Sequence, residues 1–140
     1  MATTTSRETA SPEETEALGE ELGRRLRIGD LVLLSGELGA GKTTFVRGVA
    51  RGIGSSDSVA SPTFQLVRVY RGGIQLAHVD LYRIESSVEM RDLGLDELLD
   101  QGAAVVEWGE RLDDVRVARI HFDVLGDDRR RLTVVRDLVR

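Results

Sequence analysis

The stretch that decides the fold is a glycine-rich segment with the pattern G-x-x-x-x-G-K-[ST], Gly36-Glu37-Leu38-Gly39-Ala40-Gly41-Lys42-Thr43. An apolar run, Leu31–Leu34, precedes it, and apolar residues at helical spacing follow it from Phe45 to Ile53. A strand, a glycine loop and a helix in this order form the context in which the motif binds nucleotide phosphates. The sequence therefore predicts a nucleotide-binding P-loop.

The residue types of this segment suit phosphate binding. Gly36, Gly39 and Gly41 allow left-handed backbone angles and a close approach of backbone N–H groups to phosphate oxygens. A helix that begins at Lys42 directs the positive end of its dipole at the same oxygens. We expect Lys42 to bridge the β- and γ-phosphates and the Thr43 hydroxyl to complete a Mg²⁺ shell. The other residues expected to contact ATP in this segment are Glu37, Leu38, Ala40 and Thr44.

Lysine usage supports this prediction. The chain has 19 Lys and Arg residues, and Lys42 is the single lysine among them. The compact ammonium of lysine, on its flexible stem, differs from the planar guanidinium of arginine. The chain has lysine only at the position where the motif requires it.

Composition limits the class of protein. With 140 residues, 41% of them hydrophobic, the chain is long enough for one domain with a substantial core. The net charge of -5 argues against tight independent binding to nucleic acid. The chain has no cysteine, no signal-peptide pattern and no apolar run of membrane-spanning length, so we expect a cytoplasmic location without a membrane partner.

The rest of the chain alternates helical and strand patterns. We expect a flexible N-terminus over residues 1–10 and a single P-loop domain over residues 11–140. Ser11-Pro12-Glu13-Glu14 predicts a helix start, because serine caps, proline suits the first turn and glutamate stands three residues after the cap. The remaining predicted segments are strands at about 65–70, 74–80, 103–106, 118–124 and 130–138, and helices from Ser86 to Leu93 and over 95–99.

Two turns are predicted in more detail. Arg71-Gly72-Gly73 suits a hairpin with a glycine in the left-handed region. Gly126-Asp127-Asp128 connects the last two strands, which we expect to form an antiparallel hairpin.

Two acidic residues stand at the carboxyl ends of apolar strands, where metal and water ligands of such folds gather. They are Asp80, after Ile74–Val79, and Glu107, after Ala103–Val106. One would hold Mg²⁺ and the other would orient the nucleophile; these residues alone leave open which does which.

Other polar or aromatic residues are candidates for secondary roles. Thr63 lies on the loop after the P-loop helix, where switch residues of GTPases sense the γ-phosphate; a plain turn at Ser61-Pro62-Thr63 is the alternative. Trp108 follows a candidate catalytic acid, and stacking on nucleotide or partner competes with core packing. We interpret His78 and His121 as strand-packing residues rather than ligands.

The chain resembles the bacterial TsaE (YjeE) family, the ATPase component of tRNA threonylcarbamoyladenosine (t6A) synthesis. The resemblance covers about Ser11 to the end. It rests on the P-loop with Thr44, on Ser61-Pro62-Thr63-Phe64, on His78-x-Asp80-x-Tyr82-Arg83 and on Glu107-Trp108, in the order of the family.

The resemblance implies a fold, a chemistry and partners. The fold is an α/β P-loop NTPase-like three-layer sandwich, with a mixed sheet and antiparallel C-terminal strands. The protein would bind ATP and Mg²⁺, with Thr43 and Glu107 at the metal, Asp80 needed for turnover and Thr15 near the nucleotide. Hydrolysis would stay weak until the protein docks on the TsaB–TsaD pair, which carries out the transfer and holds the tRNA.

Three other functions compete with this interpretation. A GTPase that reads guanine through an N-K-x-D motif is disfavoured, because the chain contains no Asn. A small P-loop kinase would need an acceptor pocket and an Arg-rich lid, and no stretch obviously supplies them. In a nucleotide-gated interaction module, hydrolysis would only determine when the protein is released from its partner. Comparing ATP turnover with and without partners distinguishes such a module from the preferred interpretation.

Overall fold

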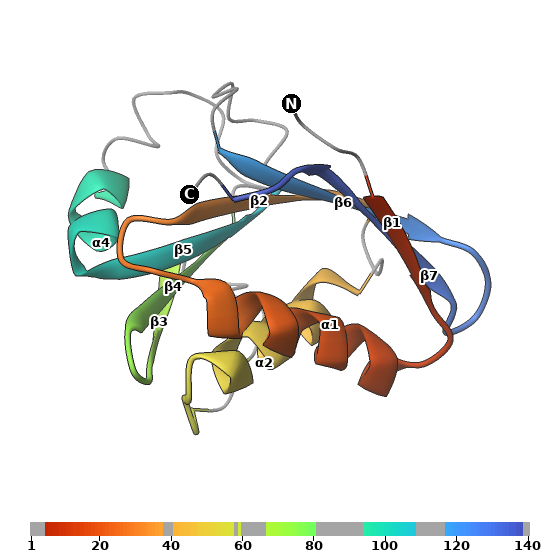
Figure 1. Cartoon of the computed structure of the whole chain (residues 1–140), viewed down its shortest axis with the longest axis horizontal. Coiled ribbons are helices and arrows are strands. Elements are labelled where there is room, and N and C mark those ends of the chain that lie inside the picture. Colours follow the sequence, from red (N-terminus) through yellow and green to blue (C-terminus); the bar gives the residue numbers. More distant parts are fainter. Residues whose placement is uncertain are drawn as a thin grey trace.

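The computed structural model describes residues 5–37, 41–57, 59, 67–80, 94–108 and 117–138. Within these residues, a seven-stranded sheet has two helices on one face and a third helix on the other (Figure 1). The helices are α1 (Pro12–Arg25), α2 (Lys42–Gly52) and α4 (Leu95–Gln101). This confirms the predicted α/β P-loop-like fold with three layers.

The sheet is parallel in its centre and antiparallel at its flanks. Its strands are β1 (Thr5–Thr9), β2 (Leu31–Gly36), β3 (Val67–Arg71), β4 (Gln75–Asp80), β5 (Gly102–Glu107), β6 (Ala118–Val124) and β7 (Arg130–Arg136). Across the sheet they lie in the order β1-β7-β6-β2-β5-β4-β3. The four central strands β6, β2, β5 and β4 are parallel to one another. On one side β7 pairs antiparallel with β6, and β1 pairs antiparallel with β7; on the other side β3 pairs antiparallel with β4.

The core divides between the two faces of the sheet. Every residue of β5 is buried, as expected of a central parallel strand covered on both sides. Alternate residues of the central strands pack beneath α1 and α2, with Phe45 and Phe122 in edge-to-face contact at 5.3 Å between ring centroids. Leu33 and Val106 belong to the opposite face, where α4 covers them.

Helix α1 begins as the sequence predicts. The Ser11 hydroxyl accepts a hydrogen bond from the Glu14 backbone N–H at 3.2 Å, and the Glu14 carboxylate accepts one from the Ala10 N–H at 3.0 Å. Pro12 occupies the first turn, where its missing N–H costs nothing. The local pattern was sufficient here because the cap is made by residues adjacent in sequence.

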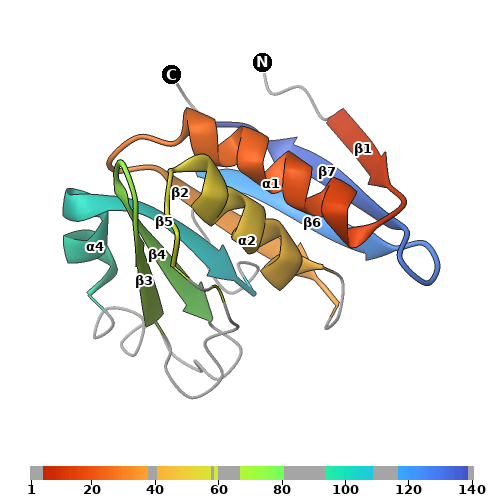
Figure 2. The same cartoon turned by 90° about the horizontal axis from the view of Figure 1, so that it is seen from below.

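Helices α1 and α2 lie side by side and run parallel (Figure 2). Their contact is made of two glycine pairs, Gly19 with Gly23 on α1 and Gly48 with Gly52 on α2. A Cβ atom on Gly48 would lie 1.9 Å from the Glu16 carbonyl oxygen, and one on Gly19 would lie 2.0 Å from that of Phe45. Only glycine permits this approach, so the backbones themselves form the contact, which we call the glycine seam.

The N-terminal segment differs from the expectation. Residues 1–10 were expected to be flexible, but Thr5–Thr9 form β1, which pairs with β7 from Thr5↔Val134 to Thr9↔Arg130. Its polar side chains show no apolar alternation, since the strand is an edge strand and four of its five residues are exposed.

The closing β6–β7 hairpin is antiparallel, as predicted, and so is β3–β4. The turn between β3 and β4 is different in detail, because neither Gly72 nor Gly73 is among the glycines with positive φ. Gly72 is instead required by close packing, since a Cβ there would lie 2.4 Å from the Ile53 carbonyl oxygen. The helix predicted from Ser86 to Leu93 lies outside the described residues.

Candidate functional site

The P-loop connects the end of β2 to the start of α2. Gly36 has φ 132° and Gly41 has φ 95°, so both adopt the left-handed angles that the motif predicts. Gly41 is the N-cap of α2, and Lys42 is its first residue. Leu38, Gly39 and Ala40 lie outside the described residues.

Lys42 is held inside the site. Its side chain is 4% exposed, and Nζ donates a hydrogen bond to the Gly36 carbonyl oxygen at 2.9 Å. The same ammonium lies 3.9 Å from the centre of the Trp108 ring, a cation–π distance. The contact joins the P-loop to the residue that follows β5.

The two predicted acids are neighbours across β4 and β5. The strand register pairs Asp80 with Glu107, and on its other side Glu107 pairs with Leu34 of β2, two residues before Gly36. Both carboxylates therefore stand at the same edge of the sheet as the P-loop. This is the juxtaposition predicted from their positions at strand ends.

Glu107 is buried and hydrogen-bonded. It is 5% exposed, and its Oε2 lies 2.5 Å from Nε2 of His78, which is fully buried. Nδ1 of His78 lies 3.4 Å from the Tyr70 hydroxyl. A buried carboxylate needs such a donor, because burial without one is costly.

Trp108 has φ 62°, the only positive value among non-glycine residues in the described parts of the chain. A bulky residue in this region carries backbone strain, which persists only where the surroundings impose it. The turn directs the indole away from the line of β5 and under the Lys42 ammonium.

A second group of side chains borders the other side of the P-loop. A small cavity of about 40 Å³ is lined by Thr15, Gly41, Thr44 and Arg130, together with Pro12 and Asp128. The Arg130 guanidinium is anchored over the β6–β7 turn by hydrogen bonds from Nη1 to the carbonyl oxygens of Gly126, Asp127 and Arg129, at 2.9–3.0 Å. The Thr15 hydroxyl is 2.7 Å from that of Thr9. Thr15, expected near the nucleotide, thus lies beside the P-loop.

The remaining candidates are distributed as follows. Thr43 and Thr44 are partly buried in the first turn of α2, and Glu37 is exposed just after β2. Thr63 lies outside the described residues. His121 is half-exposed on β6, where its Nδ1 lies 2.8 Å from the Ser35 hydroxyl and its Nε2 3.3 Å from Asp123.

Sequence reasoning missed two residues of this site. His78 was interpreted as a packing residue, although it stands two positions before Asp80 on the same strand and therefore shares its face. That alternation was a usable signal. Arg130 carried none, because only the fold brings the β6–β7 turn to the P-loop.

The donor set is compatible with Mg²⁺. Mg²⁺ prefers oxygen ligands and is commonly held by one or two side chains plus phosphates and water. The Thr43 hydroxyl and the Glu107 carboxylate offer oxygen atoms of this kind, and Glu107 Oε1 makes no hydrogen bond to the described parts of the chain. No group of three or more His, Cys, Asp or Glu side chains in those parts could hold a metal ion by itself.

Comparison with known proteins gives one consistent result. The family model described as "Threonylcarbamoyl adenosine biosynthesis protein TsaE" matches residues 9–133. The chain belongs to the TsaE family. The relatives below agree with this.

Three proteins named "tRNA threonylcarbamoyladenosine biosynthesis protein TsaE" illustrate the similarity. The Treponema pallidum protein is 42% identical over 129 residues, covering 89% of this chain and 95% of the relative. The Streptomyces coelicolor protein is 53% identical over 97 residues, or 66% of each chain. The Bacillus subtilis protein is 43% identical over 131 residues, covering 89% of this chain and 81% of the relative.

A solved structure agrees with the fold. The crystal structure of Bacillus subtilis YdiB matches with a TM-score of 0.80 and 34% identity, covering 97% of this chain and 87% of the other. Among the helices that the structure describes here, none combines the length and apolar character needed to cross a membrane.

Proposed function

We propose that this TsaE-family chain is the Mg²⁺-dependent ATP-binding and ATP-hydrolysing component of the bacterial t6A synthesis machinery. In this proposal it works in the cytoplasm with the TsaB–TsaD pair, which activates its hydrolysis. The observation that carries the proposal is the register of Glu107. It sets a buried carboxylate between Asp80 and the strand that leads into the P-loop.

The nucleotide would be bound from both sides of the P-loop. Lys42 leaves the Gly36 carbonyl oxygen to contact the β- and γ-phosphates, while the N-terminus of α2 faces the phosphates. Thr15 and Arg130 border Gly41, and so they are positioned to contact the nucleotide on the side away from the carboxylates. The Trp108 ring faces Lys42 and would sense the departure of its ammonium.

The reaction would be supported by the two strand-end acids. Thr43 and Glu107 would hold Mg²⁺, which when bound neutralises charge that develops on the phosphate oxygens. Asp80 would orient the attacking water. Its neighbour Glu107 is held by a hydrogen bond from His78.

Membership of the TsaE family and the net charge support the proposed partners. A net charge of -5 suits a protein that reaches tRNA only through other subunits, because phosphate repels an acidic surface. Thr63 remains the candidate residue that reports the γ-phosphate to the partner, and Trp108 is a second candidate.

ATP hydrolysis by the purified chain, alone and with its TsaB and TsaD counterparts, tests the proposal. Turnover should rise when the partners are added, and the product should be free phosphate. Lys42→Ala should lower turnover by at least about 100-fold and abolish ATP-dependent t6A formation. The variant lacks the ammonium that would stabilise the charge developing on the transferred phosphoryl group. Lys42→Arg should also be impaired, since a planar fork cannot replace a point charge there.

Two results would contradict the proposal. Normal t6A formation by the Lys42→Ala variant would remove the role of the P-loop. A phosphorylated small molecule in place of free phosphate would indicate a kinase. Arg129→Ala, at an exposed position on the β6–β7 turn, is the control and should leave turnover unchanged.

A further inference from the structure

A chain of buried hydrogen bonds crosses three strands beside the P-loop. It begins at the Tyr70 hydroxyl on β3, passes through both ring nitrogens of His78 on β4 and ends at Glu107 on β5. Tyr70 is 2% exposed and His78 is fully buried. The ring centroids of these two residues lie 6.1 Å apart.

One tautomer of His78 satisfies every member of the chain. An ionised carboxylate only accepts hydrogen bonds, so Nε2–H donates to Glu107 Oε2. Nδ1 of the neutral ring is then an acceptor and receives the Tyr70 O–H. The other tautomer would place an acceptor against the carboxylate at 2.5 Å.

The surroundings of His78 do not themselves require a histidine. Leu76 precedes it on the same face of β4, and Val105 is its register partner on β5. An apolar side chain would fill the same space, but it would leave the buried Glu107 carboxylate without this donor. What the ring adds at this point is a donor aimed at one oxygen of Glu107.

We propose that His78 is a positioning residue that fixes the Glu107 carboxylate for metal binding beside the P-loop; the proposal rests on the metal role assigned to Glu107 above. By occupying Oε2, His78 limits the rotation of the side chain and leaves Oε1 for the metal. Partners that orient a ligating carboxylate in this way typically change metal affinity by about 10- to 100-fold when removed.

The affinity of Mn²⁺ for the protein–ADP complex, measured by electron paramagnetic resonance, tests this role. His78→Gln places an amide N–H where histidine has Nε2 and should keep Mn²⁺ affinity within about threefold of wild type. His78→Asn places its amide near the position of Nδ1, cannot reach Glu107 and should weaken Mn²⁺ binding by about 10- to 100-fold. ADP affinity in EDTA should stay within about twofold for both, since the P-loop is untouched. Equal Mn²⁺ affinities for the two variants would overturn the proposal.

A measurement on the wild-type chain covers the case in which a variant fails to fold. In proton NMR, the His78 Nε2–H should give a far-downfield resonance that moves when Mg²⁺ is added to the ADP complex. A resonance indifferent to Mg²⁺ would overturn the proposal. His121→Phe is the matched control, because it removes a histidine that contacts a carboxylate at the half-exposed Asp123; Mn²⁺ affinity should not change.

Glu107→Gln separates this proposal from the function on which it rests. If that variant binds Mn²⁺ as well as wild type, Glu107 is not a ligand and the proposed metal site is wrong. If it loses Mn²⁺ while His78→Asn does not, the metal site stands and only the positioning role of His78 is wrong.

Discussion

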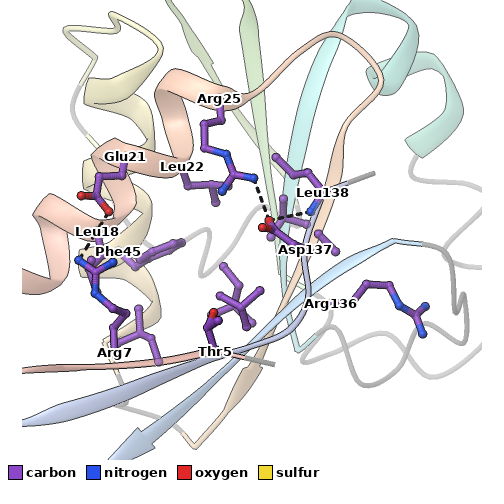
Figure 3. Close-up of a pocket in the computed structure, with 15 residues that line it drawn as sticks. Thr5, Arg7, Leu18, Glu21, Leu22, Arg25, Phe45, Arg136, Asp137 and Leu138 are labelled. Atoms are coloured by element: carbon purple, nitrogen blue, oxygen red, sulfur yellow. Dashed lines mark hydrogen bonds and ion pairs between the residues drawn. The ribbon is translucent and has the colours of Figure 1, made fainter. Parts of the chain in front are cut away.

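The two sides of α1 are packed in opposite ways. Toward α2, the helix is closely packed, because the backbones of the two helices are in direct contact at the glycine seam. Toward β1, β6 and β7, it stands over a cavity of about 350 Å³ (Figure 3). The cavity floor is apolar and its rim is charged, with Arg7–Glu21 at 3.9 Å and Arg25–Asp137 at 3.0 Å.

The difference shows which contact positions the site. The seam fixes α2 relative to α1, and these two helices carry Lys42 and Thr15 at their N-terminal ends. The cavity lies toward the other end of α1, where Leu22 and Arg25 line it. The close packing of the seam therefore accompanies the nucleotide-binding elements, whereas the 350 Å³ cavity is lined by none of the predicted site residues.

Gly48→Ala should have the largest effect, because the new Cβ would meet the Glu16 carbonyl oxygen at 1.9 Å and force the helices apart. We expect a loss of at least about 3 kcal/mol in the free energy of unfolding, which outweighs the gain of about 1 kcal/mol that alanine brings to a helix interior. Urea denaturation followed by circular dichroism measures this. ATP affinity should fall as well, because α2 carries Lys42. A variant as stable as wild type would show that the seam is not tight.

Val134→Ile should have a smaller effect of the opposite sign. Val134 lines the cavity, and one added methylene there would gain up to about 0.8 kcal/mol of stability. The matched control is Val135→Ile on the same strand, since Val135 is 46% exposed and an added methylene there should change little. Thermal denaturation of the two variants compares them. A destabilised Val134→Ile variant would mean that the cavity cannot accept more volume.

Gly126→Ala should have the smallest effect, and it is the control for the seam. Apart from its neighbours in sequence, no atom of the described residues lies within 4 Å of the Cβ position at Gly126, and its φ is outside the left-handed region. We expect a change within about 0.5 kcal/mol, as for surface substitutions in general. If Gly126→Ala cost as much as Gly48→Ala, the loss of glycine itself, rather than the clash, would be responsible.

The sequence predicted those parts of the molecule that local signals determine. The cap of α1 at Ser11, the left-handed angles at Gly36 and Gly41 and the closing hairpin all depend on neighbouring residues, and the structure has them. Asp80 and Glu107 were placed together because a general rule of parallel sheets brings strand ends to one edge.

What the sequence did not predict depends on pairs of residues far apart. The His78–Glu107 hydrogen bond joins residues 29 positions apart. Gly48 and Gly52 are four residues apart in the sequence, but the sequence does not show which helix packs against them, so the glycine seam was not predicted. The strand at Thr5–Thr9 has no apolar pattern, because this edge strand is held by backbone pairing with β7 and most of its side chains are exposed.

The pairing of β1 with β7 has a consequence for folding during synthesis. Ser6 and Thr133, whose hydroxyls lie 3.2 Å apart, are separated by 127 positions, so β1 cannot join the sheet before β7 has been synthesised. Contacts of such long sequence separation form slowly. Because β7 also begins with Arg130 beside Gly41, the surroundings of the P-loop cannot be complete in a nascent chain before β7 has been synthesised.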